Sequence, residues 1–301
     1  MTAADQEAAF DRHRRLLFSV AYQMLGSVAD AEDVVQDAWL RWSSDDRSGV
    51  ADERAYLVRT VSRLALDRLS SARARRETYV GSWLPEPLAT GTEADPAETV
   101  ELADRVSLAM LVVLETLSPV ERAVFVLREV FGLPTAEVAR ALDRSEPAVR
   151  QLAHRAREHV EARQPRFDAD RAATREVTER FLAACVGGDV DALLAALAPD
   201  VVLLSDGGGR AKAPLRPIHG AAKVARFLAA VGPQGAEVPG LRAAIIEVNG
   251  APAVAAWTGQ GPYMTVQVVV ADGLIAQVLL VTNPDKLAGI AVAGAPGPSA
   301  S

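Results

Sequence analysis

The sequence has few of the residues that metal centres and disulfide frameworks require. Its 301 residues include one cysteine, Cys185, and four histidines. A single cysteine excludes an intramolecular disulfide framework and suits a reducing cytoplasm. The histidines are scattered and lack the spacing of metal ligands. We therefore expect a cytoplasmic protein with no metal ion and no cofactor.

The sequence also shows no signal-peptide pattern and no long uninterrupted hydrophobic run. Residues 1–15 alternate acidic residues with arginine and show no signal-peptide pattern. The most apolar stretch, residues 264–281, contains Gln267, Asp272 and Gln277 and is interrupted at Gly273. This stretch predicts two strands rather than a membrane span, so we expect no membrane partner.

What is present is an ordinary globular composition with an uneven distribution of charge. Half of the residues are hydrophobic and 24% are charged, with a net charge of −7. Residues 54–76 nevertheless contain seven arginines against one acidic residue, and residues 144–166 contain six against three. Because screening limits the reach of a charge to about 10 Å, a nucleic acid would respond to these basic stretches rather than to the net charge.

The first half of the chain predicts helices. Apolar residues recur at helical spacing over 6–24, 30–42 and 53–76, with a polar loop over 43–53. Residues 81–98 are rich in proline and acidic residues and predict an extended linker. Further helices are predicted over 99–116, 118–130, 135–142 and 145–163. Ser118 and Glu121 form a capping box, and Ser145 caps the last helix.

The pattern changes after residue 165. Helices are predicted over 172–186, 190–197 and 221–231, and strands over 201–204, 241–248, 253–258, 264–270 and 274–281. Helices followed by strands indicate an α+β domain with an antiparallel sheet. The end of the chain, rich in Ala, Gly and Pro, predicts a frayed tail.

Residues 133–159 have the pattern of a helix-turn-helix. Val138 and Leu142 of the first helix would pack against Val149 of the second. The face opposite that contact carries Arg150, Gln151, His154 and Arg155. These four residues could enter a major groove together, where Arg binds guanine and Gln pairs with adenine. The alternative is an amphipathic helical hairpin with a solvated basic face.

A second candidate surface is acidic. Asp33, Gln36 and Asp37 lie at i, i+3 and i+4 on one side of the helix over 30–42. The alternative interpretation is a solvated helix face whose early acids match the helix dipole. The arginines of residues 54–76 have a similar alternative, an ordinary charged surface.

The order of these motifs resembles that of bacterial sigma factors of the extracytoplasmic-function (ECF) class. Residues 31–37 (AEDVVQD) resemble region 2.2, which docks on the clamp helices of the β′ subunit of RNA polymerase. Residues 56–68 resemble regions 2.3 and 2.4, which read and melt the −10 element. The segment Ser118–Arg122 and the helix-turn-helix resemble region 4, which reads the −35 element.

This resemblance implies partners and residues. The partners are core RNA polymerase, including its β′ clamp helices and β flap, and promoter DNA. Polymerase contacts are expected at Asp33, Gln36 and Asp37. Contacts with −10 DNA are expected at Arg59, Arg63 and Arg68. Contacts with −35 DNA are expected at Arg150, Gln151, His154 and Arg155.

Three further motifs resemble one group of this class that carries a fused C-terminal SnoaL-like domain. They are 83–87 (WLPEP), 206–210 (DGGGR) and 283–287 (NPDKL). The resemblance implies a cone-shaped α+β domain with a curved antiparallel sheet, which modulates sigma activity by contacting the linker and the first sigma domain. The residues expected at this contact are Trp83, Leu84, Pro85, Asp206, Gly207, Gly208, Asn283, Pro284 and Asp285. The chain departs from the pattern at Pro134, where many members have a serine cap, so the start of the first motif helix is less defined.

We therefore predict a multi-domain protein with two all-α sigma domains and an α+β domain. The expected boundaries are 6–78 for region 2, 79–98 for the linker, 99–164 for region 4, 170–288 for the SnoaL-like domain and 289–301 for the tail. The predicted function is that of a sigma factor and not of an enzyme.

Two alternatives have different chemistry. One is a DNA-binding regulator that senses an unidentified small ligand in the C-terminal domain, which leaves the acidic face unexplained. The other is a SnoaL-like enzyme with a DNA-binding appendage, whose candidate pocket groups are Asp206, His219, Trp257 and Tyr263. Each of these four also has a structural interpretation: Asp206 braces the glycine turn, His219 lies at a helix start, and the two aromatic residues belong to the core. A likeness of fold does not by itself carry an activity.

Overall fold

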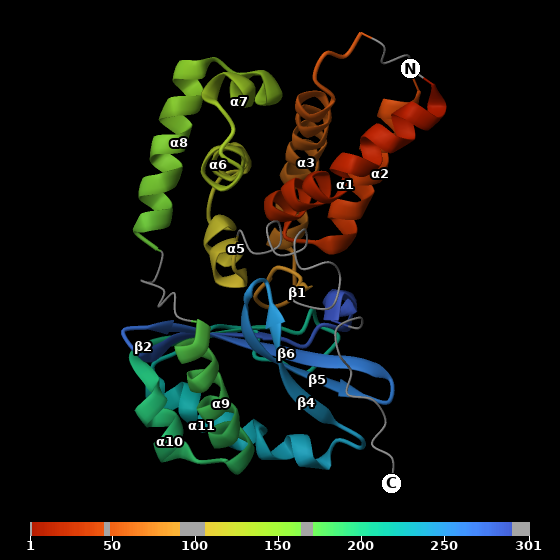
Figure 1. Cartoon of the computed structure of the whole chain (residues 1–301). Helices are drawn as coiled ribbons and strands as arrows, with labels where there is room; N and C mark the ends of the chain where they lie inside the picture. Colours follow the sequence, from red (N-terminus) through yellow and green to blue (C-terminus); the bar gives the residue numbers. More distant parts are fainter. Residues whose placement is uncertain (1, 45–48, 91–105, 164–170, 291–301) are drawn as a thin grey trace. The chain divides into compact units, whose positions relative to one another are not determined.

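The computed structural model describes residues 2–44, 49–90, 106–163 and 171–290 (Figure 1). These residues form two compact units. The first comprises residues 1–78 and 110–163, and the second comprises residues 79–109 and 164–301. Parts of four predicted features lie outside the described residues. They are residues 45–48 of the polar loop, 91–98 of the linker, 99–105 of the helix predicted to start at 99, and 291–301 of the tail.

Three helices make up the first half of unit 1. They are α1 (Ala3–Leu25), α2 (Val28–Ser43) and α3 (Glu53–Glu77). Gly26, at a φ of 67°, ends α1 in the left-handed conformation that favours glycine, and Ser27 caps α2. The core between the helices includes the fully buried side chains of Leu17, Trp42 and Leu57. These helices confirm the predicted periodicity.

The second half of unit 1 contains the helix-turn-helix. Its elements are α5 (Leu108–Leu114), α6 (Pro119–Phe125) with a π-helical turn (Val126–Val130), α7 (Thr135–Leu142) and α8 (Glu146–Glu161). The capping box of Ser118 and Glu121 is formed, and Ser145 caps α8. Pro134 gives α7 no side-chain cap, and the helix begins at Thr135 as expected. Within the described ranges, no helix combines the length and hydropathy needed to cross a membrane.

Unit 2 is built on a seven-stranded sheet in the order β1-β4-β5-β6-β7-β2-β3. The main strands are β2 (Leu197–Asp206), β4 (Arg242–Val248), β5 (Ala251–Thr258), β6 (Gly261–Ala271) and β7 (Leu274–Val281), and β3 is Ile218–His219. The strands β4 to β7 pair antiparallel, as predicted, but β2 pairs parallel with β7. The sheet is therefore mixed. No hairpin joins β2 to β7, so nothing local forces these strands to run in opposite directions.

One strand comes from the predicted linker. Residues Ala89–Thr90 form β1, which pairs antiparallel with β4 at the edge of the sheet. The amide of Leu88 donates to Oδ1 of Asn249 (3.0 Å), and the amide of Asn249 donates to the carbonyl of Leu88 (2.8 Å). The stretch 79–90 is thus part of unit 2 rather than a free connection.

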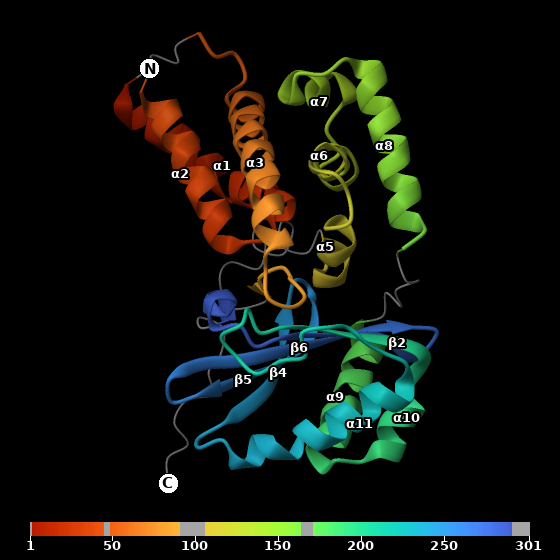
Figure 2. The same ribbon diagram turned by 180° about the vertical axis from the view of Figure 1, so that it is seen from behind.

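Helices cover one face of this sheet. They are α9 (Arg171–Gly187), α10 (Val190–Ala196) and α11 (Ala221–Val231), and both views place them on the same side (Figures 1 and 2). Phe181 and Leu193 from the helices share a core cluster with Val254 and Val268 of the sheet. Cys185 lies in this core, where burial raises the pKa of its thiol to about 12. The thiol therefore stays protonated and unreactive near neutral pH.

Candidate functional site

The predicted polymerase-binding residues lie on the exposed side of α2. Asp33, Gln36 and Asp37 are exposed, while Val34 and Val35 on the opposite side are buried. Leu40, one turn further along, is also unusually exposed for a leucine, at 57%. The helix therefore presents an acidic face with one apolar side chain at its end.

Arg68, predicted to bind −10 DNA, lies against this acidic helix. Its Nε donates to Oδ1 of Asp30 at 2.8 Å, and its guanidinium also pairs with Asp33. A residue expected at the polymerase and a residue expected at DNA thus form one ion pair between α2 and α3. The pair fixes the position of Asp33.

Arg63, also predicted to bind −10 DNA, is bonded to the end of α7. Its Nε donates to the carbonyl of Ala141 at 2.9 Å, and its Nη2 donates to the carbonyl of Arg140 at 3.1 Å. The last carbonyls of a helix have no partner within the helix and carry partial negative charge. Arg63 of α3 therefore caps the C-terminal end of α7. Arg59, the third residue of the set, lies 5.3 Å from the centroid of the Tyr56 ring.

Arg122 makes the reciprocal contact. From α6 it donates through Nε and Nη2 to the carbonyl of Gln23, in the last turn of α1, at 3.3 and 3.2 Å. It also pairs with Glu115, and only 1% of its surface is exposed. Each half of unit 1 thus supplies an arginine that caps a helix of the other half. Arg122 lies in the Ser118–Arg122 motif, but its capping role is not predictable from the sequence, because a buried charge leaves no periodic signal.

The helix-turn-helix has the predicted packing. Val138, Leu142 and Val149 are buried. On the other side of α8, Arg150, Gln151, His154 and Arg155 are all exposed. Arg150 pairs with Glu146 (2.8 Å), and Arg155 pairs with Glu121 (3.5 Å). Exposed pairs of this kind contribute about 0–1 kcal/mol, so both guanidiniums can exchange their partners for DNA at little cost.

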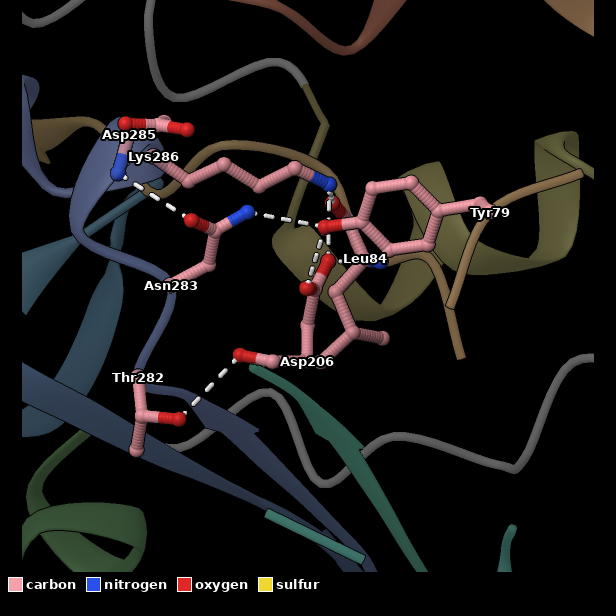
Figure 3. A network of polar contacts seen from close by, with 7 residues as sticks. All are labelled: Tyr79, Leu84, Asp206, Thr282, Asn283, Asp285 and Lys286. Atoms are coloured by element: carbon pink, nitrogen blue, oxygen red, sulfur yellow. Dashed lines mark hydrogen bonds and ion pairs between the residues drawn. The ribbon is translucent and has the colours of Figure 1, made fainter. Parts of the chain in front are cut away.

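The three motifs of the second unit meet at one buried carboxylate, which Figure 3 shows. Asp206, fully buried at the end of β2, accepts hydrogen bonds from the Tyr79 hydroxyl at 2.6 Å and the Leu84 amide at 2.8 Å. The Nζ of Lys286 lies 2.7 Å from the same carboxylate and also donates to the Leu84 carbonyl at 2.6 Å. We call Tyr79, Leu84, Asp206, Asn283 and Lys286 the clasp.

Two aromatic rings and the Asn283 amide make further contacts within or beside the clasp. The Lys286 ammonium lies 4.0 Å from the centroid of the Trp83 ring and 4.9 Å from that of Tyr79, within the range of cation–π attraction. Asn283 donates to the Tyr79 oxygen at 2.8 Å. Burial and the hydrogen bond to Asp206 raise the pKa of Tyr79, so its hydroxyl remains a donor at every physiological pH. Residues 79–84 are therefore fixed to unit 2 by charge, hydrogen bonds and ring contacts.

The glycines that follow Asp206 make room for the clasp. A Cβ at Gly208 would lie 2.3 Å from Nδ2 of Asn283 and 2.9 Å from the Tyr79 oxygen, and one at Gly207 would lie 2.6 Å from the Ala211 carbonyl. All three distances are shorter than van der Waals contact. Gly208 also has a φ of 58°, where glycine is favoured.

The structure brings together most of the residues predicted for the regulatory contact. Leu84, Pro85 and Asn283 are buried at the clasp and Trp83 is half-buried beside it. Pro284 and Asp285 are exposed, and Asp285 pairs instead with Arg210 at 2.8 Å. Tyr79 and Lys286 were not among the residues predicted from the sequence for this contact. Lys286 lies inside the NPDKL motif, whereas Tyr79 follows an arginine-rich helix and carries no motif signal.

The residues considered for catalysis do not share one environment. Asp206 is occupied by the clasp, Trp257 is buried with its Nε1 3.4 Å from the Ile290 carbonyl, and His219 and Tyr263 are exposed. Within the described part of the chain, no group of three or more His, Cys, Asp or Glu is placed to hold a metal ion.

Family models match all three domains. A model of sigma-70 region 2 matches residues 9–75, a model of sigma-70 region 4 matches residues 107–160, and a model of the SnoaL-like domain matches residues 178–278.

Individual sigma factors are also similar to this chain over much of its length. The chain is 44% identical over 292 residues to the ECF RNA polymerase sigma factor SigJ of Mycobacterium tuberculosis, covering 93% of this chain and 92% of the relative. It is 41% identical over 196 residues to the probable ECF RNA polymerase sigma factor SigI of that species, covering 64% and 67% of the two chains. The crystal structure of SigJ superposes with a TM-score of 0.75 at 39% identity, covering 94% of this chain and 98% of that one.

The clasp predicts that Asp206→Asn will destabilise unit 2 strongly. The substitution leaves Lys286 buried without a countercharge, and breaking a buried pair in this way costs about 3–5 kcal/mol. Urea unfolding of the full chain, with limited proteolysis of residues 79–90, measures the loss. The matched control is Asp285→Asn, which removes an exposed pair and should cost about 1 kcal/mol or less. Equal effects of the two substitutions would contradict the assignment.

The glycine turn gives a second prediction. Gly208→Ala should open the clasp, whereas Gly209→Ala should not. Both glycines have positive φ, so alanine at either carries a similar backbone penalty of about 1–2 kcal/mol. A Cβ at Gly209, however, would meet its nearest atom only at 3.4 Å. Tyr79 and Asn283 must move only in the first variant. Hydrogen–deuterium exchange of the peptide containing residues 79–90 should therefore accelerate in Gly208→Ala alone.

Proposed function

Because the chain belongs to the ECF RNA polymerase sigma factors that carry a C-terminal SnoaL-like domain, we propose that it binds core RNA polymerase and directs it to promoters, with the C-terminal domain modulating this activity. One observation carries the proposal. Unit 1 presents an acidic face on α2 and a basic face on α8 of the helix-turn-helix. The opposite side of each helix is apolar and buried, which fixes the orientation of the exposed face. The chain is then a regulator without catalytic chemistry of its own.

We place the contact with the polymerase β′ clamp helices on Asp33, Gln36 and Asp37. The ion pair with Arg68 orients Asp33, so part of this face is preorganised for its partner. Charged groups in such a surface determine the partner and the rate of association. The acidic character of the face predicts a basic counterpart on the polymerase.

We assign promoter reading to α3 and α8. Arg59, Arg63 and Arg68 would contact the −10 strand, and the loop 43–53 would capture an unstacked base. The four exposed residues of α8 would read the −35 groove. Positions −10 and −35 are about 25 base pairs apart, which at about 3.4 Å per base pair is about 85 Å along the duplex. Since Arg63 is bonded to α7, the two halves of unit 1 must separate before both elements are read.

We propose that the C-terminal domain acts through the linker. Residues 79–90 connect the two DNA-reading halves in the sequence and are bound by the clasp. The docked stretch buries Leu84 and Pro85, and deletion of the whole domain would leave these apolar side chains without their packing. Substitutions within the clasp, such as Asp206→Asn, are therefore a sharper test of modulation than truncation after residue 165.

Charge reversal tests the polymerase contact. Asp37→Arg should weaken binding to core polymerase about tenfold or more, because a like charge would oppose the basic counterpart. The measurement is equilibrium binding of labelled full-length protein to purified core enzyme. Asp11→Arg, on exposed α1, is the control and should bind as the unmodified chain does. If both variants bind normally, the docking face is elsewhere.

Loss of a base contact tests the −35 assignment. Arg150→Ala should cost roughly 1–3 kcal/mol at the cognate promoter and relax specificity at one −35 position. Run-off transcription with core enzyme on a set of −35 variants measures the effect. Arg144→Ala, in the turn before α8, should preserve the ranking of those promoters. An unchanged ranking with Arg150→Ala would refute the role of this residue.

A further inference from the structure

One segment of unit 2 carries positive charge that neither the clasp nor the DNA-reading helices use. Residues 207–236 contain five arginine and lysine residues and no acidic residue, in a chain whose net charge is −7. Arg210 pairs with Asp285 at 2.8 Å and so belongs to the surface beside the clasp. The other four are all exposed, namely Lys212, Arg216, Lys223 and Arg226.

These four charges have no countercharge of their own. Within the part of the chain that the structure describes, none of them forms an ion pair. One exposed carboxylate, that of Asp200, lies near them: the Gly220 amide donates to the Val201 carbonyl at 2.8 Å, which places Asp200 of β2 beside the start of α11. A single carboxylate leaves this surface with an excess of positive charge.

The helix α11, labelled in Figure 2, presents two of the charges on one face. Lys223 and Arg226 lie at i and i+3 and are therefore neighbours on the helix surface. The side chains exposed next to them are those of Ala222 and Ala230, which are small enough to let a partner approach closely. Gly220 gives the helix no side-chain cap, so the first N–H groups add partial positive charge at the same end.

The composition of this surface indicates the class of partner. Arg216 extends the charge to β3 at the edge of the sheet, and we call Arg216, Lys223 and Arg226 the basic edge. Protein interfaces have aromatic or apolar anchors and little lysine, and the basic edge offers no such anchor. The exposed Leu215 next to it lies near Gly81, whose Cβ would be 3.6 Å from the leucine Cδ2. Interfaces with DNA are more polar and much more positive. We infer that the basic edge binds the phosphate backbone of duplex DNA.

A contact of this kind adds affinity without sequence preference. Phosphates repeat identically along a duplex, so side chains that bind them carry no direct sequence information. Under the proposed function, on which this consequence rests, the duplex is promoter DNA that α8 also contacts. Binding by unit 2 then becomes the second attachment of one molecule, which strengthens the complex through effective concentration.

The salt dependence of duplex binding tests the inference. The full chain is titrated with a labelled duplex of random sequence and about 30 base pairs, at salt concentrations from about 50 to 200 mM. The double substitution Lys223→Ala and Arg226→Ala should lower the affinity about tenfold or more. The slope of log K against log salt should fall by nearly 2, because each lost phosphate contact removes about 0.9. Alanine suits an exposed helix face, and thermal unfolding checks that the fold is kept.

Two further variants separate a local contact from a general effect of charge. Arg180→Ala removes an exposed arginine of the same unit, on α9, where Glu176 and Glu179 are also exposed. This control should leave both the affinity and the salt slope unchanged. Asp200→Asn removes the carboxylate beside the basic edge and should act in the opposite direction, strengthening duplex binding.

Three results would overturn the inference: no binding of the full chain to the duplex at about 50 mM salt, an unchanged slope in the double variant, or an equal loss in Arg180→Ala. A double variant that binds the duplex normally but core polymerase weakly would assign the basic edge to a protein partner, and so would also overturn it. The titration contains no polymerase. Failure of the unmodified chain in run-off transcription would therefore count against the proposed function and not against this DNA contact.

Discussion

The burial of one negative charge organises the second unit. An ionised carboxylate inside a protein is costly unless a countercharge and hydrogen-bond donors surround it. Asp206 receives its countercharge from Lys286 and two donors from Tyr79 and Leu84. These partners come from stretches that are more than a hundred residues apart in the sequence. The requirement to satisfy one carboxylate therefore explains why three separate short motifs occur in the same chain.

A related principle holds the first unit together. Two of the contacts between its halves place a guanidinium on the unpaired carbonyls at the end of a helix. Arg122 is buried, and its contact is correspondingly costly to break, whereas Arg63 is exposed and exchanges more readily. The two contacts thus differ in strength. Under the proposed function DNA also requires Arg63, so intramolecular capping and DNA binding would compete for it.

Much of this architecture is predictable from local signals. Gly26, Ser118 and Ser145 mark helix ends and starts through their backbone or capping chemistry, and the sequence places these boundaries within a few residues. The strands β4 to β7 follow from apolar runs separated by turns. Such features depend on neighbouring residues alone, which is why one sequence is sufficient to find them.

The features that escaped prediction depend on distant partners. The strand β1 has two residues and takes its hydrogen bonds from β4, so it has no pattern of its own. The parallel pairing of β2 with β7 is a property of the whole sheet. Asp206 and Asn283 were found through motif resemblance, but the roles of Tyr79, Arg122 and Lys286 appear only once the chain is folded. A buried charge is invisible in sequence until its partner is known.

Docking of residues 79–90 also limits how far apart the two halves of unit 1 can move. Residues 79–109, which is 31 positions, separate these halves along the sequence. A fully extended chain of that length reaches at most about 110 Å, and the 19 positions left after docking reach at most about 65 Å. The first value exceeds the distance between the two promoter elements, and the second falls short of it. Under the proposed function, the buried pair of Lys286 and Asp206 would therefore set the length of chain that is free to extend between the two halves.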